Sequence, residues 1–266
     1  MRNAVYTECR KNLTSVSFLC GVISVLYLCL TSSVYTDAHS KSFTALEMLF
    51  PANRALVSEI SFKTAAISGL NNPYARLFLP IAAGMSFVPQ ICTERHSGYT
   101  RFQLIRSTRL RLALARCMSA MLLGGITVFL GFILYSLYAV CIFPSKVQNG
   151  SDMMTLSIPF WKIAAGKLCT GAVSAAMPLL LCTWLSDAYF ILCLPVLWYF
   201  LLATAQSTLH TAGAQRILSF VQPLGAAELM MSYSFRHLLL VLLTPVTACS
   251  FFCFRHIRKR RGDCAD

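Results

Sequence analysis

The chain has 266 residues, of which 56% are hydrophobic and 12% are charged, and its mean hydropathy is +0.62. Soluble domains carry about 25% charged residues, so this composition argues against a soluble protein. The formal net charge is +13, but the basic residues gather at the edges of apolar runs, which argues against nucleic-acid binding and favours contact with anionic lipid headgroups.

The amino-terminal segment 1–12 is basic and precedes the first apolar run. Val5, Cys9 and Leu13 recur at the spacing of one helical face, which predicts a short amphipathic helix on the inner leaflet. A frayed polar tail is the alternative. The run that follows is longer than the apolar core of a signal peptide, so we interpret it as an uncleaved first span.

Long apolar runs recur along the chain, and each approaches the length that crosses a hydrocarbon layer of about 30 Å. They cover residues 13–32, 77–92, 113–142, 163–183, 188–208 and 237–254. Backbone polar groups must pair within each run in lipid, so all six should be helices. Pro80 and Pro89 predict a kink or an earlier start for the second run. The third should continue from the preceding loop as one long tilted helix.

Lysine and arginine set the orientation of such a chain. Fourteen of them fall in the short segments 2–11, 95–116 and 255–261, and nine fall in the longer segments between the other runs. The sequence therefore predicts an all-α polytopic membrane protein, one transmembrane domain over 1–266, with both termini cytoplasmic. The segments outside the spans are the external 33–76, the cytoplasmic 93–112, the external or re-entrant 209–236, and the basic cytoplasmic tail 255–266.

The external segment 33–76 has apolar residues at helical spacing. Phe43, Leu46 and Phe50 fit one helical face, and the stretch 56–67 fits a second one. Two amphipathic helices are expected here, at the outer membrane surface. They would form either a structural cap over the bundle or a substrate gate.

Glycines in the third and fourth predicted spans allow helices to approach closely. Gly124, Gly125 and Gly131 lie in the third span, and Gly166 and Gly171 lie in the fourth. We expect them to serve mainly packing within the chain.

Catalytic and metal-binding patterns are missing from the sequence. No carboxylate lies in the middle of a predicted span, and the cysteines form no Cys-x-x-Cys pair. There is no His-Glu-x-x-His pattern and no Gly-x-x-x-x-Gly-Lys-Ser/Thr loop. We therefore predict no enzyme activity, metal site or bound cofactor in this chain. If it pumps, ATP is hydrolysed on another chain.

Lys167 is the deepest charge in the predicted spans. One interpretation is an anion-attracting group on a substrate path. The alternative is a lysine that extends its four-carbon stem to the outer surface.

The arginine-rich island from Glu94 to Arg109 separates two strongly apolar runs. Gly98 permits a turn away from the span. Tyr99, Phe102 and Ile105 then recur every three residues and form an apolar edge that suits a groove of a cytosolic partner. Arginines beside that edge suit acidic residues on the partner; they are Arg101, Arg106 and Arg109. The alternative is a solvated loop whose arginines only set topology.

The order of residues in this island resembles the ABC-2 type permease family. Glu94-Arg95-x-x-Gly98 is followed by a short amphipathic stretch, by Arg106-Ser107-Thr108-Arg109, and by Arg116 at the next span. In that family an acidic-basic pair ends the second span, and a glycine, a short helix, a threonine- or serine-rich turn and a lysine follow. Thr108 lacks the proline that usually follows it, and Arg116 stands where lysine is common.

The resemblance implies the membrane subunit of an ATP-driven ABC transporter, most simply an exporter in a bacterial plasma membrane. It implies a homodimer, or a heterodimer with a similar permease. A separate cytosolic ATPase would bind ATP and magnesium and dock on the island. The implied docking residues are Glu94, Arg95, Gly98, Tyr99, Phe102, Ile105, Arg106 and Arg109. A non-transporting multi-span protein, such as a sensor or an assembly factor, is the alternative from another class.

Overall fold

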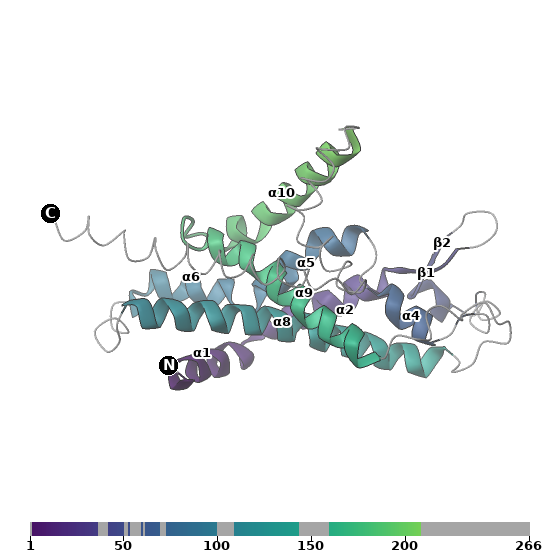
Figure 1. Cartoon of the computed structure of the whole chain (residues 1–266), viewed down its shortest axis with the longest axis horizontal. Coiled ribbons are helices and arrows are strands. Elements are labelled where there is room, and N and C mark those ends of the chain that lie inside the picture. Colours follow the sequence, from purple (N-terminus) through teal and green to yellow (C-terminus); the bar gives the residue numbers. More distant parts are fainter. Residues whose placement is uncertain are drawn as a thin grey trace.

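A computed structural model describes residues 2–36, 42–50, 53, 60, 62–69, 73–99, 109–143 and 160–208. Most of these residues are helical, and α10 projects away from the other helices (Figure 1). In chain order the elements are α1 Arg2–Leu13, α2 Val16–Leu30, β1 Ser33–Thr36, β2 Ser42–Thr44, the 3₁₀ helix η1 Glu47–Leu49, α4 Phe62–Ser68, α5 Pro73–Met85, α6 Val88–His96, α8 Arg109–Ile142, α9 Phe160–Leu181 and α10 Ala188–Thr208. The helical class is confirmed.

Several helices have the length and composition of membrane spans. Arg111–Ile142 and Ile163–Leu181 qualify by themselves. The bent pairs α1 with α2 and α5 with α6 qualify when each pair is taken together, and Ala188–Leu201 is a shorter apolar helix. Two to four candidate spans in the described chain indicate a membrane-embedded protein. The predicted last span, segment 209–236 and the tail lie outside the described residues, so six spans remain a prediction.

The second predicted span consists of α5 and α6, which meet at a bend of 50°. α5 starts at Pro73, earlier than the predicted residue 77. An earlier start was one of the two outcomes predicted from Pro80 and Pro89. The bend does not lie at Pro80, which is inside α5. Pro89 has no N–H to donate to the carbonyl of Met85 and crowds that carbonyl, and Met85 is the last residue of α5. Pro89 therefore accounts for the position of the break.

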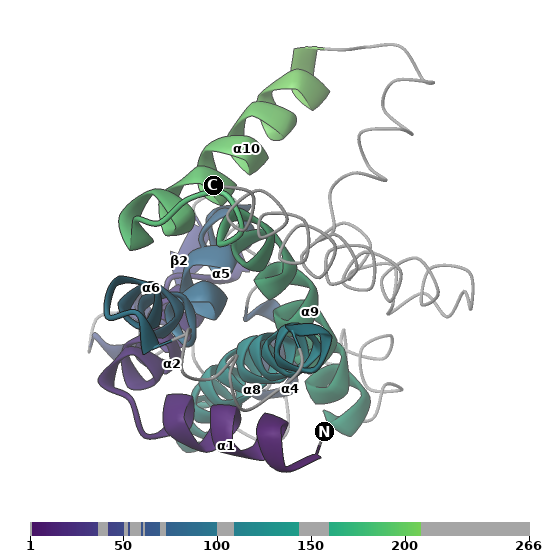
Figure 2. The ribbon, with the colours of Figure 1, turned by 90° about the vertical axis from the view of Figure 1, so that its left-hand side faces the viewer.

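The predicted amino-terminal helix is confirmed as α1, and it turns by 68° into α2. Ser15 caps α2, because its hydroxyl accepts a hydrogen bond from the backbone N–H of Phe18. α1 crosses close to α8 at one end of the bundle (Figure 2). Asn12 is buried, whereas Tyr6 is exposed. Contact of the exposed face with the inner leaflet remains a prediction.

The first expected external helix, through Phe43, Leu46 and Phe50, is wrong. β2 pairs with β1 as an antiparallel hairpin, and η1 follows. Thr44 and Glu47 close the turn reciprocally: the Glu47 carboxylate accepts from the Thr44 N–H at 2.9 Å, and the Thr44 hydroxyl accepts from the Glu47 N–H at 3.3 Å. This is the pattern of a capping box, and pairing with β1 prevails over helical spacing. Of the second expected helix, the structure describes α4.

The hairpin of β1 and β2, and α4, are fastened to the carboxyl-terminal end of α8. Tyr135 donates a hydrogen bond to the carbonyl of Ala65 at 2.9 Å, and Tyr138 donates to the carbonyl of Ala45 at 2.9 Å. α6 and the start of α8 lie at the opposite end of the bundle (Figure 1). The segments predicted to face opposite sides of the membrane are thus at opposite ends of α8.

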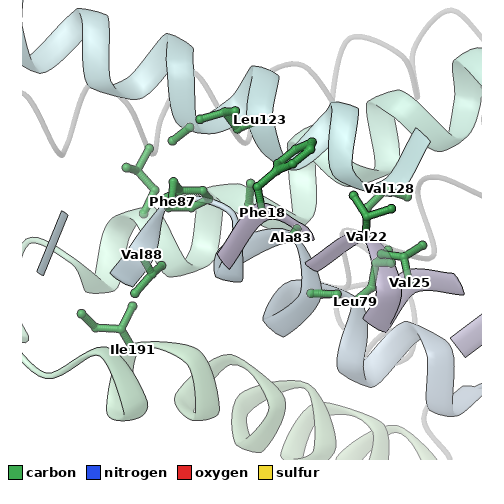
Figure 3. Packing of buried hydrophobic residues seen from close by; sticks show 14 of the residues in the cluster. Phe18, Val22, Val25, Leu79, Ala83, Phe87, Val88, Leu123, Val128 and Ile191 are labelled. Carbon is green, nitrogen blue, oxygen red and sulfur yellow. The ribbon is translucent and has the colours of Figure 1, made fainter. Parts of the chain in front are cut away.

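The core lies where α2, α5, α8 and α9 meet, and Figure 3 shows side chains such as Phe18, Leu79 and Leu123 packed within it. The helices approach closely at glycines. A Cβ added to Gly171 on α9 would lie 2.6 Å from the carbonyl oxygen of Gly124 on α8. The predicted close packing within the chain is confirmed at this seam.

Candidate functional site

The candidate site lies at the carboxyl end of α6, where the predicted docking loop begins. α6 ends at His96, and the N–H of Ser97 donates to the carbonyl of Thr93 at 2.9 Å. Gly98 follows with φ +70°, and its N–H donates to the carbonyl of Arg95 at 3.3 Å. A side chain on Gly98 would meet nothing within 4 Å, so backbone conformation is what favours glycine. The predicted turn is confirmed.

Glu94 is the centre of a buried ion-pair cluster. Its side chain is 4% exposed, and each carboxylate oxygen has a cationic partner. Oε1 lies 2.5 Å from the Nζ of Lys11 on α1, and Oε2 lies 2.6 Å from Nη2 of Arg116 on α8. One carboxylate therefore holds both α1 and α8 to the end of α6.

The two cations of this cluster have different surroundings. The side chain of Arg116 is 7% exposed, whereas that of Lys11 is 39% exposed. The ammonium of Lys11 also lies 5.0 Å from the centre of the Tyr99 ring, within the range of a cation–π contact. Glu94 is the only carboxylate in segment 93–112. Because Arg116 is buried and Lys11 is partly exposed, the Glu94–Arg116 ion pair is shielded from solvent and the Glu94–Lys11 ion pair is open to it.

Arg95 points to a different part of the bundle. Its Nη1 donates to the carbonyl of Leu185 at 2.7 Å, and its Nη2 donates to the carbonyl of Cys182. Both carbonyls lie just beyond the end of α9, in the turn that leads to α10. The carboxyl end of a helix carries partial negative charge, which a guanidinium stabilises. Glu94 and Arg95, adjacent in sequence, thus join α6 to α1, to α8 and to the α9–α10 turn.

The other predicted docking residues are only partly described. Tyr99 is 48% exposed and lies beside Lys11. Arg109 begins α8, but its side chain lies outside the described part of the structure. Three further residues, Phe102, Ile105 and Arg106, lie outside the described residues altogether. The structure therefore brings together Glu94, Arg95, Gly98 and Tyr99.

Lys167 lies on α9, away from this cluster. Its side chain is half-buried, and its ammonium lies 5.9 Å from the centre of the Phe132 ring on α8. The contact places the charge against an aromatic ring in the α8–α9 seam. A role on a substrate path remains a prediction.

Lys11 and Arg116 were absent from the docking residues predicted from sequence. A signal for them existed: a carboxylate at the end of an apolar run needs a positive partner, and both residues were predicted on the same side of the membrane. Among the described residues, no group of three His, Cys, Asp or Glu side chains is arranged to hold a metal ion.

A comparison with protein-family models finds no match, and a comparison with curated proteins finds no significant one. The resemblance to ABC-2 permeases therefore rests on the residues and the layout of this chain.

Proposed function

We propose that this chain is the membrane-spanning subunit of an ATP-driven exporter in a bacterial plasma membrane. A separate cytosolic subunit hydrolyses ATP and docks on the loop 94–109. The observation that carries the proposal is the pair Glu94 and Arg95, because it links the base of that loop to α1, α8 and the α9–α10 turn. A force applied to the loop by a partner would reach most of the bundle.

α8 gives such a force a path across the membrane. Its 34 residues form a helix about 50 Å long, longer than a hydrocarbon layer of about 30 Å. Arg116 pairs with Glu94 near one end, and Tyr135 donates to the carbonyl of Ala65, in the segment predicted to be external, near the other. A displacement of the loop would therefore move the inner and outer ends of α8 together.

The sequence of the loop also suits a protein partner. Tyr99, Phe102 and Ile105 recur every three residues in its sequence next to several arginines, and aromatic residues and arginine are enriched where proteins bind one another. The sequence contains no Gly-x-x-x-x-Gly-Lys-Ser/Thr pattern for ATP phosphates. Energy from ATP would then have to enter through a docked subunit.

The second candidate is a non-transporting membrane protein, such as a sensor or an assembly factor. In that case the cluster around Glu94 is a static support for the end of α6, and the arginines of the loop only fix topology. A gene for a Walker-motif ATPase beside this one favours the transporter.

Co-expression tests the proposal. The chain is produced together with the neighbouring ATPase, purified through a tag on the chain, and placed in lipid nanodiscs. The transporter proposal expects an ATPase in fixed stoichiometry with two permease subunits, either two copies or this chain with a similar one, and ATP hydrolysis that depends on the permease. An ATPase that never associates with the chain would contradict the proposal.

A further inference from the structure

We propose that Arg95 is a positioning residue that clamps the α9–α10 turn to the base of the docking loop, and that it does not itself bind the partner subunit. The clamp is a property of this chain alone. Its role in transport rests on the function proposed above.

The first support is the hydrogen bonding at the end of α9. Carbonyls in its last turn already accept from the backbone N–H groups that follow them. They belong to Pro178, Leu180 and Leu181. The carbonyls of Cys182 and Leu185 lie beyond the last residue of α9, and each accepts from one nitrogen of the Arg95 guanidinium. Cys182 is fully buried, so its carbonyl has little access to water as a substitute hydrogen-bond donor.

The second support is the charge on the two sides of the turn. Asp187 caps α10, since its carboxylate accepts from the N–H of Tyr189 at 3.0 Å. An anion thus lies at the positive end of α10, and Arg95 lies at the negative end of α9. The cap on α10 comes from the turn itself, whereas the cap on α9 comes from α6. One of the two charged groups at the turn is therefore supplied by α6.

The third support is the position of α10. It leaves the bundle at this turn and projects away from α8 (Figures 1 and 2). Many of its side chains are exposed, including Tyr189 at 82% and Leu197 at 62%. α10 also contacts α5, α6 and α9, and Ile191 in its first turn is buried in the core. The turn therefore sets the direction of α10 together with these contacts. Arg95 is followed three residues later by Gly98, where the loop begins, so movement of the loop would reorient α10.

Site-resolved thiol labelling of Cys182 tests the clamp in the full-length chain in nanodiscs. Arg95→Gln keeps a polar side chain but removes the charge and the two-pronged donor. Arg95→Lys keeps the charge on a donor that lacks the planar fork. Arg111→Gln is the matched control, because Arg111 is an exposed arginine on α8 on the same predicted side of the membrane. Maleimide addition to Cys182 is followed by mass spectrometry.

We expect Arg95→Gln to speed labelling of Cys182 by about tenfold or more, the usual effect of losing a hydrogen bond to a charged donor on a local opening equilibrium. Removal of a nearby cation would by itself slow a thiolate reaction, so faster labelling reports opening. The labelling rate of Arg95→Lys should fall between those of the wild type and Arg95→Gln. The rate of Arg111→Gln should match the wild type. If Arg95→Gln does not accumulate in cells, the clamp is tested by comparing the Cys182 labelling rate of Arg95→Lys with that of Arg111→Gln.

Co-purification with the ATPase separates the clamp from docking. We expect Arg95→Gln to retain the ATPase but to lose permease-dependent stimulation of ATP hydrolysis. Wild-type rates of Cys182 labelling in both Arg95 variants would overturn the clamp. Loss of the ATPase with Cys182 still protected would make Arg95 a docking residue, and would also overturn it. If the wild-type chain binds no ATPase and Arg95→Gln still speeds labelling of Cys182, the clamp stands and the proposed function is refuted.

Discussion

The guanidinium of Arg116 donates to the carboxylate of Glu94 at 2.6 Å, and the two side chains are 7% and 4% exposed. The other oxygen of Glu94 is taken by Lys11, whose side chain is 39% exposed. One carboxylate therefore joins a buried cation and a half-exposed one. Removing a partner of a buried pair is costly because it leaves a charge in a place with little water, whereas an exposed pair contributes little.

Substitution of the two cations should separate these effects. Arg116→Gln should lower the free energy of unfolding by about 3 kcal/mol or more, and Lys11→Gln by about 1 kcal/mol or less. Denaturant titration of both variants in the same detergent measures the difference. Equal losses for the two would show that Glu94 is not anchored mainly to α8.

The α8–α9 seam gives a second prediction, with a control on the same helix. A Cβ on Gly171 would lie 2.6 Å from the backbone oxygen of Gly124, whereas a Cβ on Gly166 would meet nothing within 4 Å. Gly171→Ala should therefore destabilise the protein by about 1–3 kcal/mol. Gly166→Ala should be neutral or slightly stabilising, because alanine favours helix. Thermal unfolding of both variants in detergent measures the two changes in stability. A Gly166→Ala variant that is less stable than Gly171→Ala would contradict the close approach of α8 and α9 at Gly171.

The attachment of α4 to α8 gives a third prediction. Tyr135 is fully buried and donates to the carbonyl of Ala65. Tyr135→Phe leaves that carbonyl without its donor and should cost about 1–3 kcal/mol. Tyr27→Phe is the control, since Tyr27 is 61% exposed. If denaturant titration gives the same loss of unfolding free energy for both variants, the hydroxyl of Tyr135 does not hold α4 to α8.

Topology gives a fourth prediction. Gln103→Cys should react with a membrane-impermeant maleimide only after the cells are opened, and Ser42→Cys should react in intact cells, because basic residues concentrate in the segment that contains residue 103. Ser42 is an exposed residue of β2, so its labelling is not limited by burial. The background chain has its exposed native cysteines replaced. Labelling of residue 103 from outside would contradict the predicted orientation.

Periodicity and composition predicted the long helices well, because an apolar run in lipid has no alternative to internal hydrogen bonding. The continuous α8 and the turn at Gly98 were both expected from sequence. The hairpin was missed, because Phe43, Leu46 and Phe50 fit a helical face, while cross-strand pairing depends on residues outside that stretch: Phe43 pairs with Tyr35. The threonine and glutamate of the Thr44–Glu47 turn were a local signal that spacing alone overlooked.

The sequence predicted the central residues of the candidate site but not their contacts. Charge pattern singled out Glu94 and Arg95, but sequence did not tell which groups they contact. Lys11 is 83 positions from Glu94, and the carbonyl of Leu185 is 90 positions from Arg95. A backbone carbonyl has no signature in a sequence, so the link from Arg95 to the α9–α10 turn required the structure.

Docking of an ATPase on the loop 94–109 is the central claim, and co-purification of Phe102→Ala tests it most directly. Truncation of an aromatic anchor at an interface costs about 2 kcal/mol or more. Phe50→Ala is the matched control, because Phe50 is 60% exposed at the opposite end of the bundle. We expect Phe102→Ala to lose most of the ATPase that co-purifies with the wild type, and Phe50→Ala to retain it. Equal ATPase recovery with both variants would contradict the claim, and would leave the loop as an element of topology alone.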